Sequence, residues 1–457
     1  MAEETQAPNL LPLGLVLAML LWIFTTTGGQ QILVKEILSE AYDSQAEHLV
    51  RGDPGVDSEA IRAEAMVVNG KIRMYFGPFP ALVRIPLNYV YPSGRGQWSR
   101  ITGFCAGMIA LAAFAGLIRL GLRSSQLLSR WRNWVGNACL VGFAFGSPLL
   151  LLLGNLSIYG EAMIWGLAWS LAALYFACRS RKAESSALTL SLLAFSFCAG
   201  CALLSRVTFG APFLLIAPLL ALRLLPRDRL RNLAALFLPL GTALVFYLLL
   251  SYAKFGNFQG TSWDHYVNAA QREFTQKHGF SRLERVPYSF VDYFALRYPE
   301  LKREPPFLKA YMHRYDHPTL YAMPFTETYS SLIWFSSWIL LGAVIGVAML
   351  FRRRNSDWVD RIIAGIFFVQ VIAIMSVPGI IQRYAAEFYP FLIFSFVFFL
   401  QTGRAVFHLR YLLIALVAVS VLINSLVTVS WLVDADLNVP PKTRDAWKAF
   451  LGRELPH

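Results

Sequence analysis

Four charged residues lie inside or at the ends of long apolar stretches of the sequence: Glu161, Arg206, Arg383 and Glu387. A charge close to hydrocarbon is costly, so each is a candidate functional residue. Arginine holds phosphate by forked hydrogen bonds, and an apolar groove suits a hydrocarbon tail. The combination predicts a site for a substrate with a phosphate or pyrophosphate head and a lipid tail.

A second candidate group is acidic and follows the first apolar stretch. Glu36, Glu40, Asp43 and Glu47 recur at helical spacing, which places them on one stripe of an amphipathic helix near the membrane surface. The stripe has a simpler interpretation as the solvated face of that helix. The other charges have simpler interpretations too: Glu161 bonded to a neighbouring helix, Arg206 as a snorkelling anchor, and Arg383 paired with Glu387.

The elements that position these residues are membrane helices. The chain of 457 residues is 56% hydrophobic and only 15% charged, which a soluble domain of this length could not carry without exposing apolar surface. We expect an all-α polytopic membrane protein with about eleven transmembrane helices in a single domain, 1–457. The apolar segments centre on 10–27, 101–121, 134–153, 156–178, 187–205, 207–225, 233–252, 331–351, 361–378, 385–402 and 410–433.

Alternate connections between these segments differ in charge. One set is rich in arginine and lysine, around 119–132, 179–182, 223–231, 352–361 and 404–410. The positive-inside rule assigns this set to the cytoplasm, and it also accounts for the formal net charge of +13 without a nucleic-acid partner. The N-terminus is then cytoplasmic, its first helix is retained because no basic region precedes it, and the tail 434–457 is extracytoplasmic.

Two extracytoplasmic loops, 28–100 and 253–330, are long enough to carry function. In the first, β-prone runs flank Asn69-Gly70 and predict a hairpin, and FGPFPALVRIP then predicts a bent re-entrant segment. The second is rich in aromatic residues, has a short amphipathic helix near 262–277, and suits a lid at headgroup level. The predicted topology places Asp43 and the four charges of the apolar stretches on the extracytoplasmic side. We expect them in one chamber covered by both loops.

Other motifs point to little chemistry. No phosphate-cradling G-x-x-x-x-G-K-[ST] loop is present, and nucleotide sugars are not available outside the cytoplasm, so a lipid-linked donor is expected. The five cysteines fall in apolar segments as packing residues. The histidines of the second loop, His265, His278, His313 and His317, are spaced unlike a zinc site.

Four stretches resemble the GT-C superfamily of polyprenyl-phosphate-sugar-dependent membrane glycosyltransferases. AYDSQAEHLVRGD resembles the acidic motif of that family's first outer loop, and YFGPFPALVRIP its Pro-rich segment. YGEAMIWG and RYAAEFYPFL resemble segments of bacterial members. Among the families of this layout, the chain is similar to the protein mannosyltransferases, the aminoarabinose transferase of lipid A and bacterial family-39 enzymes.

The resemblance implies roles for particular residues. Asp43 corresponds to the catalytic base or metal contact. Transfer would be inverting, with the charge of the departing lipid phosphate neutralised by Arg206, Arg383, Lys254 or Arg84. Glu161, Glu387 and Glu64 would support them. The family's second acidic residue before the Pro-rich segment is replaced here by Met74-Tyr75-Phe76-Gly77, and the nearest acids upstream are Glu59 and Glu64. The need for a divalent cation (Mg²⁺ or Mn²⁺) therefore stays open.

The implied partners are a lipid-linked sugar donor, membrane lipid and a glycan, lipid or protein acceptor, in the bacterial inner membrane. The main alternative is a transporter or flippase of a lipid-linked sugar without transfer chemistry. Transporters commonly carry inverted repeats with broken helices at the midplane. The sequence shows no such pair, and its unusual charges are predicted at one face, which favours an enzyme. A structural or assembly factor would leave those charges unexplained.

Overall fold

The computed structural model describes residues 7–125, 127–181, 183–224, 229–312, 328–352, 357–434 and 438–453. Among them, eight helical stretches are long and apolar enough to cross a membrane by length and composition. They are α5 (Ser99–Arg123), α6 with α7 (Ser129–Phe145 and Pro148–Gly154), α8 (Ile158–Ser180), α9 (Ser185–Ser205), α11 (Arg229–Phe255), α16 (Trp358–Met375), η7 with α17 (Gln382–Phe388 and Tyr389–Leu400) and α18 (Arg404–Asp434).

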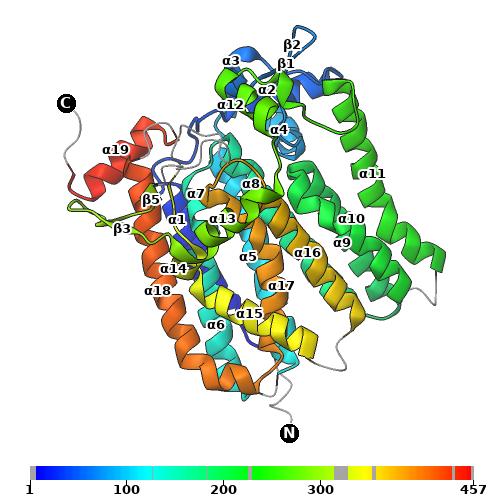
Figure 1. Cartoon of the computed structure of the whole chain (residues 1–457), viewed down its shortest axis with the longest axis vertical. Coiled ribbons are helices and arrows are strands. Elements are labelled where there is room, and N and C mark those ends of the chain that lie inside the picture. Colours follow the sequence, from blue (N-terminus) through cyan, green and yellow to red (C-terminus); the bar gives the residue numbers. More distant parts are fainter. Residues whose placement is uncertain are drawn as a thin grey trace.

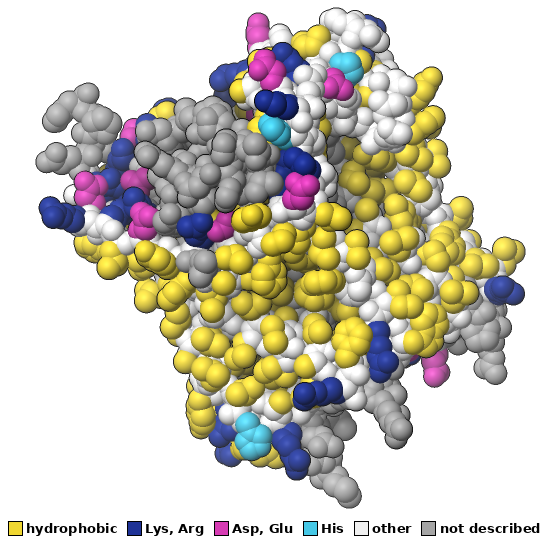
Figure 2. Space-filling view, in the orientation of Figure 1, with side chains coloured by type: hydrophobic (Ala, Val, Ile, Leu, Met, Phe, Trp, Pro, Cys, Tyr) yellow, Lys and Arg dark blue, Asp and Glu magenta, His cyan; other side chains and the backbone are white. Residues whose placement is uncertain are grey.

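Three shorter apolar helices complete the bundle: α1 (Leu11–Thr25), α10 (Val207–Leu224) and α15 (Ser337–Arg352), the last preceded by the single turn α14 (Leu332–Phe335). Each of the predicted apolar segments coincides with one of these helical stretches, so the all-α, multi-pass membrane architecture is confirmed. The surface agrees, since Figure 2 shows a broad hydrophobic region between charged residues at the two ends of the molecule.

The two long loops gather at one end of the bundle, together with the C-terminal helix α19 (Pro441–Phe450) (Figure 1). The first loop forms α2 (Glu40–Val50), α3 (Ser58–Ile61), η2 (Arg62–Glu64), β1 (Met66–Val68), β2 (Lys71–Arg73), α4 (Phe79–Val90) and η3 (Pro92–Gly94). The second forms η4 (Trp263–His265), α12 (Ala269–His278), η5 (Leu283–Arg285), α13 (Val286–Val291), η6 (Asp292–Leu296) and the strands β3 (Glu300–Leu301), β4 (Leu308–Lys309), β5 (Tyr311–Met312) and β6 (Thr328–Tyr329).

The opposite end carries arginine-rich connections. There Arg181, after α8, pairs with Asp360 in α16, and Arg223 in α10 pairs with Asp357. These ion pairs bring three of the predicted cytoplasmic connections to one end, as the charge pattern requires. Which end faces the cytoplasm remains a prediction of the positive-inside rule.

Small residues let the central helices approach closely. A Cβ at Gly103 of α5 would lie 2.3 Å from a methyl of Leu156, and one at Gly107 would lie 3.3 Å from Leu153. Membrane helices without a hydrophobic driving force between them associate through such small-residue contacts. The spacing of four residues places both glycines on one face of α5, against α7 and the segment that follows it.

The hairpin predicted at Asn69-Gly70 is present. Strands β1 and β2 are antiparallel, with Val68 opposite Lys71 and two residues between them. Asn69 and Gly70 have φ of 52° and 75°, the positive values that a type I′ turn requires at both central positions. The hairpin leads into α4, so the Pro-rich segment forms a helix, with Pro78 as its cap residue, Pro80 in its first turn and Pro86 inside it.

The predicted first-loop helix is shorter than expected and its acidic stripe is not uniformly solvated. The helix begins at Glu40 because Leu38 adopts φ of 58°, outside the right-handed helical region. Glu36 and Asp43 are buried, whereas Glu40 pairs with Lys35 and Glu47 with Arg95 near the surface. The solvated-face interpretation is therefore wrong for Glu36 and Asp43.

A histidine fastens the turn after α2 to that helix. His48 Nδ1 lies 2.6 Å from Asp53 Oδ2, and Nε2 lies 3.2 Å from Asp57 Oδ1. Arg73 of the hairpin donates to Asp53, and Ser44 donates to Asp57. Only an imidazolium donates from both ring nitrogens. Burial alone would lower the pKa of His48, but the bonds to Asp53 and Asp57 outweigh it and raise the pKa.

We predict that this fastening weakens as the pH rises. The stabilisation by protonated His48 is complete below about pH 6.5, the usual pKa of histidine, and is lost as the pH rises through the raised value in the folded protein. Hydrogen exchange of residues 51–65, corrected for its intrinsic pH dependence, should accelerate over that range. His48→Gln should exchange fast at every pH, and a wild-type profile flat with pH would contradict the prediction.

Candidate functional site

A buried ion pair joins the Pro-rich helix to the membrane bundle. Arg84 of α4 donates from Nη2 to both carboxylate oxygens of Glu161, at 2.8 and 2.7 Å, and all of the side chain is buried. Ser99 and Thr102, in the first turn of α5, each accept from the guanidinium and donate to Glu161. Every donor and acceptor in the pair therefore has a partner except Arg84 Nε, which faces Asp43.

Asp43 lies at the edge of this ion pair. Its Oδ2 is 3.6 Å from Arg84 Nε, and the residue has no exposed surface. Neither carboxylate oxygen completes a hydrogen bond of ordinary geometry, although the Asn88 amide and the Gly96 N–H lie nearby. A carboxylate so poorly solvated has unused capacity to accept a proton.

Burial is the largest influence on Asp43 and raises its pKa above the usual range of an aspartate. The negative charge of Glu161 adds to the rise. The positive charge of Arg84 and the donors of Asn88 and Gly96 lower the pKa but do not cancel the effect of burial. Asp43 is thus a stronger base than an exposed aspartate and is held beside a single guanidinium.

A cavity of about 190 Å³ lies between the Pro-rich segment and the membrane helices. Its walls come from 75–78, from the junction of α9 and α10 at Arg206, from α11 at Lys254, and from Gly260 and Thr261 of the second loop. Lys254 donates from Nζ to the Met74 carbonyl, at 2.9 Å. Two cations at the wall of one cavity are suited to an anionic group.

Arg206, at the cavity wall, is paired with Glu387. Its Nε lies 2.8 Å from Glu387 Oε1, and its guanidinium lies over the Tyr384 ring at 5.3 Å. Arg383 lies over the rings of Tyr159 and Tyr384, at 4.6 and 5.8 Å. The expected pairing of Arg383 with Glu387 is therefore replaced by Arg206 with Glu387, and Arg206 is held by a carboxylate as well as placed at a helix start.

Glu64 connects the two long loops. Its Oε2 accepts from the hydroxyls of Tyr75 and Tyr266, each at 2.7 Å. The backbone adds a link, since the Val267 N–H donates to the Ala65 carbonyl at 3.0 Å. The second loop thus rests on the hairpin region next to the cavity, and Glu64 joins the cavity wall at Tyr75.

The Asp43 cluster and the cavity adjoin through aromatic side chains. Phe76 lines the cavity, and its ring packs edge-on against Tyr42, the residue before Asp43, with centroids 6.4 Å apart. The Tyr42 hydroxyl donates to the Ile158 carbonyl at 2.9 Å. Both Arg84 and Arg206 are close enough to lower the pKa of Tyr42, which burial raises well above its usual value. Tyr42 therefore lies within electrostatic reach of both arginines.

The donor set does not fit a divalent cation as arranged. The nearest charge to Asp43 is the guanidinium of Arg84, which would repel a metal ion. Among the described residues, no group of three or more His, Cys, Asp or Glu side chains could hold a metal ion. No chemical step is therefore assigned to a metal here. His313 and His317 lie outside the described residues.

Some residues of the site could not be singled out from the sequence. Ser99 and Thr102 satisfy Glu161 but are common residues at a helix start. Tyr75 lines the cavity, Tyr266 packs on Tyr75, and Tyr159 and Tyr384 lie under Arg383, all without a motif. The one available clue was the high aromatic content of the outer loops. Aromatic side chains suit both a headgroup surface and a sugar-binding wall, so the clue was ambiguous.

The fold is similar to that of a known membrane enzyme. The oligosaccharyltransferase of Archaeoglobus fulgidus, in the apo form, matches with a TM-score of 0.50 and 11% sequence identity, over 97% of this chain and 60% of that one. The AglB oligosaccharyltransferase of the same archaeon, in complex with an inhibitory peptide and a dolichol-phosphate, matches with a TM-score of 0.48 and 10% identity. This chain spans about 60% of their length.

Sequence comparison adds no closer relative: no protein-family model matches the chain, and no curated protein does. At this level of identity the likeness concerns the fold alone. The chain is a multi-pass membrane protein whose fold resembles that of the Archaeoglobus fulgidus oligosaccharyltransferase.

We predict that Arg84→Gln destabilises the protein strongly, because it leaves Glu161 buried without its countercharge. Breaking a buried pair by removing one partner costs roughly 3–5 kcal/mol. The double variant Arg84→Gln/Glu161→Gln, which removes both charges of the pair, should recover a large part of the loss. Thermal unfolding in detergent measures both, and a double variant as unstable as the sum of the single variants would contradict the prediction.

We also predict that Gly77→Ala distorts the cavity. A Cβ at Gly77 would lie 2.3 Å from the carbonyl oxygens of Leu204 and Ser205, both backbone atoms that cannot rotate away. Such overpacking costs typically about 1–3 kcal/mol. Gly241→Ala is the matched control, since no atom lies within 4 Å of its added Cβ. Melting temperatures of the two variants should differ, with only Gly77→Ala lowered.

Proposed function

We propose that this protein is a membrane glycosyltransferase that moves a sugar from a polyprenyl phosphate or pyrophosphate donor to an acceptor on the extracytoplasmic side. The observation that carries the proposal is the cavity lined by Arg206 and Lys254, whose wall residue Phe76 packs on Tyr42, the residue before the buried Asp43. The likeness of the fold to an oligosaccharyltransferase supports it. The acceptor is a glycan, a lipid or a protein of the cell envelope, and the membrane is the bacterial inner membrane.

The donor phosphate fits the cavity by charge. Arg206 is paired with Glu387, whereas Lys254 has no carboxylate partner among the residues that the structure describes and donates to the Met74 carbonyl. Arg383 is a third cation near Arg206, since both guanidinium groups lie over the Tyr384 ring. As the sugar leaves, negative charge grows on the phosphate oxygen, and fixed cations stabilise it in a site with little water.

Asp43 acts as the general base in this proposal. It takes the proton of an acceptor hydroxyl while the acceptor oxygen forms a bond to the anomeric carbon and the bond from that carbon to the phosphate oxygen breaks. The electron pair of the broken bond stays with the phosphate, and the anomeric configuration inverts. Because Asp43 has no exposed surface, side chains around it must move before an acceptor reaches it.

Arg84 takes a different role from the one first expected. Its guanidinium is fully buried and engaged by Glu161, Ser99 and Thr102, which leaves no face for a phosphate. We assign to Arg84 and Glu161 the positioning of Asp43, and to Glu64 the joining of the two outer loops at the cavity. Glu387 fixes the direction of Arg206.

The proposal predicts that Asp43→Asn abolishes transfer while the amount of the protein in the membrane stays at the wild-type level. The lipid-linked sugar profile of membranes from cells lacking the protein is compared with cells that carry wild type or variant. Loss of a general base typically lowers the rate by about 100-fold or more, so the same polyprenyl-linked sugar should accumulate in the null and Asp43→Asn cells. Glu47→Gln, a change on the same helix at a surface ion pair, is the matched control and should match wild type.

The outcomes separate the enzyme from a transporter. If Asp43→Asn behaves as wild type while the null strain accumulates the donor, the catalytic role of Asp43 is wrong and transport of a lipid-linked sugar becomes the better account. If the protein is a transporter, the donor accumulates on the cytoplasmic face of the membrane in the null strain. If it is an enzyme, the donor accumulates on the outer face in that strain.

A further inference from the structure

Arg100, in the first turn of α5, is the centre of a second buried network. Its Nε donates to Glu36 at 2.7 Å, and its Nη1 donates to the Gln31 carbonyl at 3.0 Å. Its Nη2 donates to the Thr443 hydroxyl at 2.6 Å. Arg100, Glu36 and Thr443 are almost entirely buried, which makes each of these contacts costly to leave unmade.

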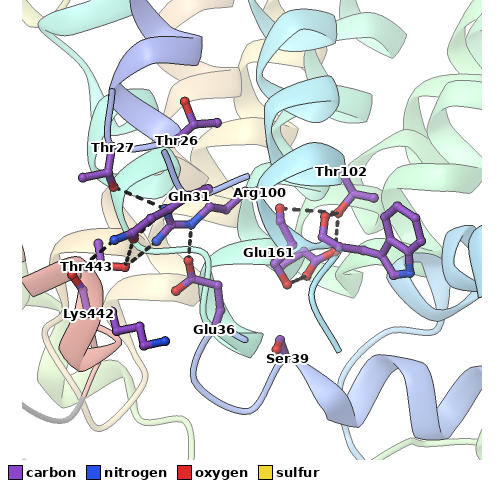
Figure 3. A network of polar contacts seen from close by, with 12 residues as sticks. Thr26, Thr27, Gln31, Glu36, Ser39, Arg100, Thr102, Glu161, Lys442 and Thr443 are labelled. Carbon is purple, nitrogen blue, oxygen red and sulfur yellow. Dashed lines mark hydrogen bonds and ion pairs between the residues drawn. The ribbon is translucent and has the colours of Figure 1, made fainter. Parts of the chain in front are cut away.

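The network attaches the C-terminal helix α19 to the start of the first loop (Figure 3). The Thr443 hydroxyl donates to Gln31 Oε1 at 2.7 Å, and Gln31 Nε2 donates to the Lys442 carbonyl at 3.2 Å. The Trp447 ring packs on Phe24 of α1, with centroids 5.4 Å apart. Residues separated by about four hundred positions in the sequence therefore share one set of hydrogen bonds.

The segment between this network and α2 is strained and held from both sides. Leu38 has φ of 58°, which a leucine adopts only where its surroundings require it. The Ile37 carbonyl accepts from the Ile158 N–H at 3.1 Å, and the Ser39 hydroxyl donates to the Gly96 carbonyl at 2.6 Å. Helix α2 begins at the next residue, and Asp43 follows within its first turn.

We propose that Arg100 is a positioning residue for Asp43 and that it acts by fastening the C-terminal helix α19 to the segment that leads into α2. Thr443 is the contact through which α19 takes part. The effect of Arg100 on transfer rests on the proposed function. The connection between α19 and the segment before α2 rests on geometry alone. Without the contact, the 31–39 segment is released on one side and the burial of Asp43 is reduced.

Thr443→Val tests the link because it keeps the shape of the side chain and removes the hydroxyl. Loss of a buried hydrogen bond weakens a segment by about 1 kcal/mol or more, so amide exchange over residues 31–44 in detergent should rise by several-fold to tenfold. Thr443→Ser, which restores the hydroxyl, should return exchange to the wild-type rate. Lys442→Gln is the control, because its contact uses the backbone carbonyl.

The pH profile of transfer separates positioning from mere stability. Burial is the main cause of the raised pKa of Asp43, so admission of water lowers that pKa and moves the acid limb of the profile to lower pH in Thr443→Val. The limb should return to its place in Thr443→Ser. A variant that only reduced the amount of folded protein would lower the rate without moving the limb.

Two results would overturn the inference. One is unchanged amide exchange over residues 31–44 in Thr443→Val. The other is faster amide exchange in that variant with no shift of the acid limb of the pH profile of transfer. Should Thr443→Val fail to fold, Arg100→Lys keeps the charge opposite Glu36 and removes the donor to Thr443, and the same two measurements apply. Absence of any transfer by wild type refutes the proposed function alone, because the exchange data still decide the link between α19 and α2.

Discussion

The ion pair of Arg84 with Glu161 is the interaction on which the outer half of the molecule depends. Two charges removed from water are tolerated only when each finds its countercharge and its hydrogen bonds. Meeting that condition here requires α4, the first turn of α5 and the first turn of α8 to meet at one point. Once they do, Arg84 Nε has one direction left, and Asp43 occupies it.

As a consequence, two neighbouring groups of charged residues have different roles. The group around Arg84 is buried and hydrogen-bonded except at Arg84 Nε, and it holds a carboxylate whose own bonds are incomplete. The group around Arg206 and Lys254 places two basic side chains at the wall of a cavity. The hairpin and the Pro-rich segment belong to both, because Phe76 lines the cavity and packs on Tyr42. A small shift of this segment therefore affects both groups.

Much of this was accessible from the sequence, and the limits have physical causes. Long apolar segments give the helices, because hydrocarbon thickness fixes their length, and Asn69-Gly70 gives the hairpin, because few residues accept positive φ twice. The partner of Glu387 was not accessible, since Arg383 is four residues away but Arg206 is distant in the chain. Spacing along a helix predicts local pairs, whereas packing between helices decided this one. The burial of Glu36 depended in the same way on Arg100 and on Thr443 at the far end of the chain.

The burial of Asp43 bears on how a transferase avoids hydrolysis of its donor. A lipid-linked sugar is an activated compound, and water is the most abundant nucleophile outside the membrane. A base that touches no solvent cannot activate a stray water molecule against the donor. If Asp43 is the base, hydrolysis of the donor is suppressed whenever no acceptor is present, and the sugar is kept for the acceptor whose arrival moves the surrounding side chains.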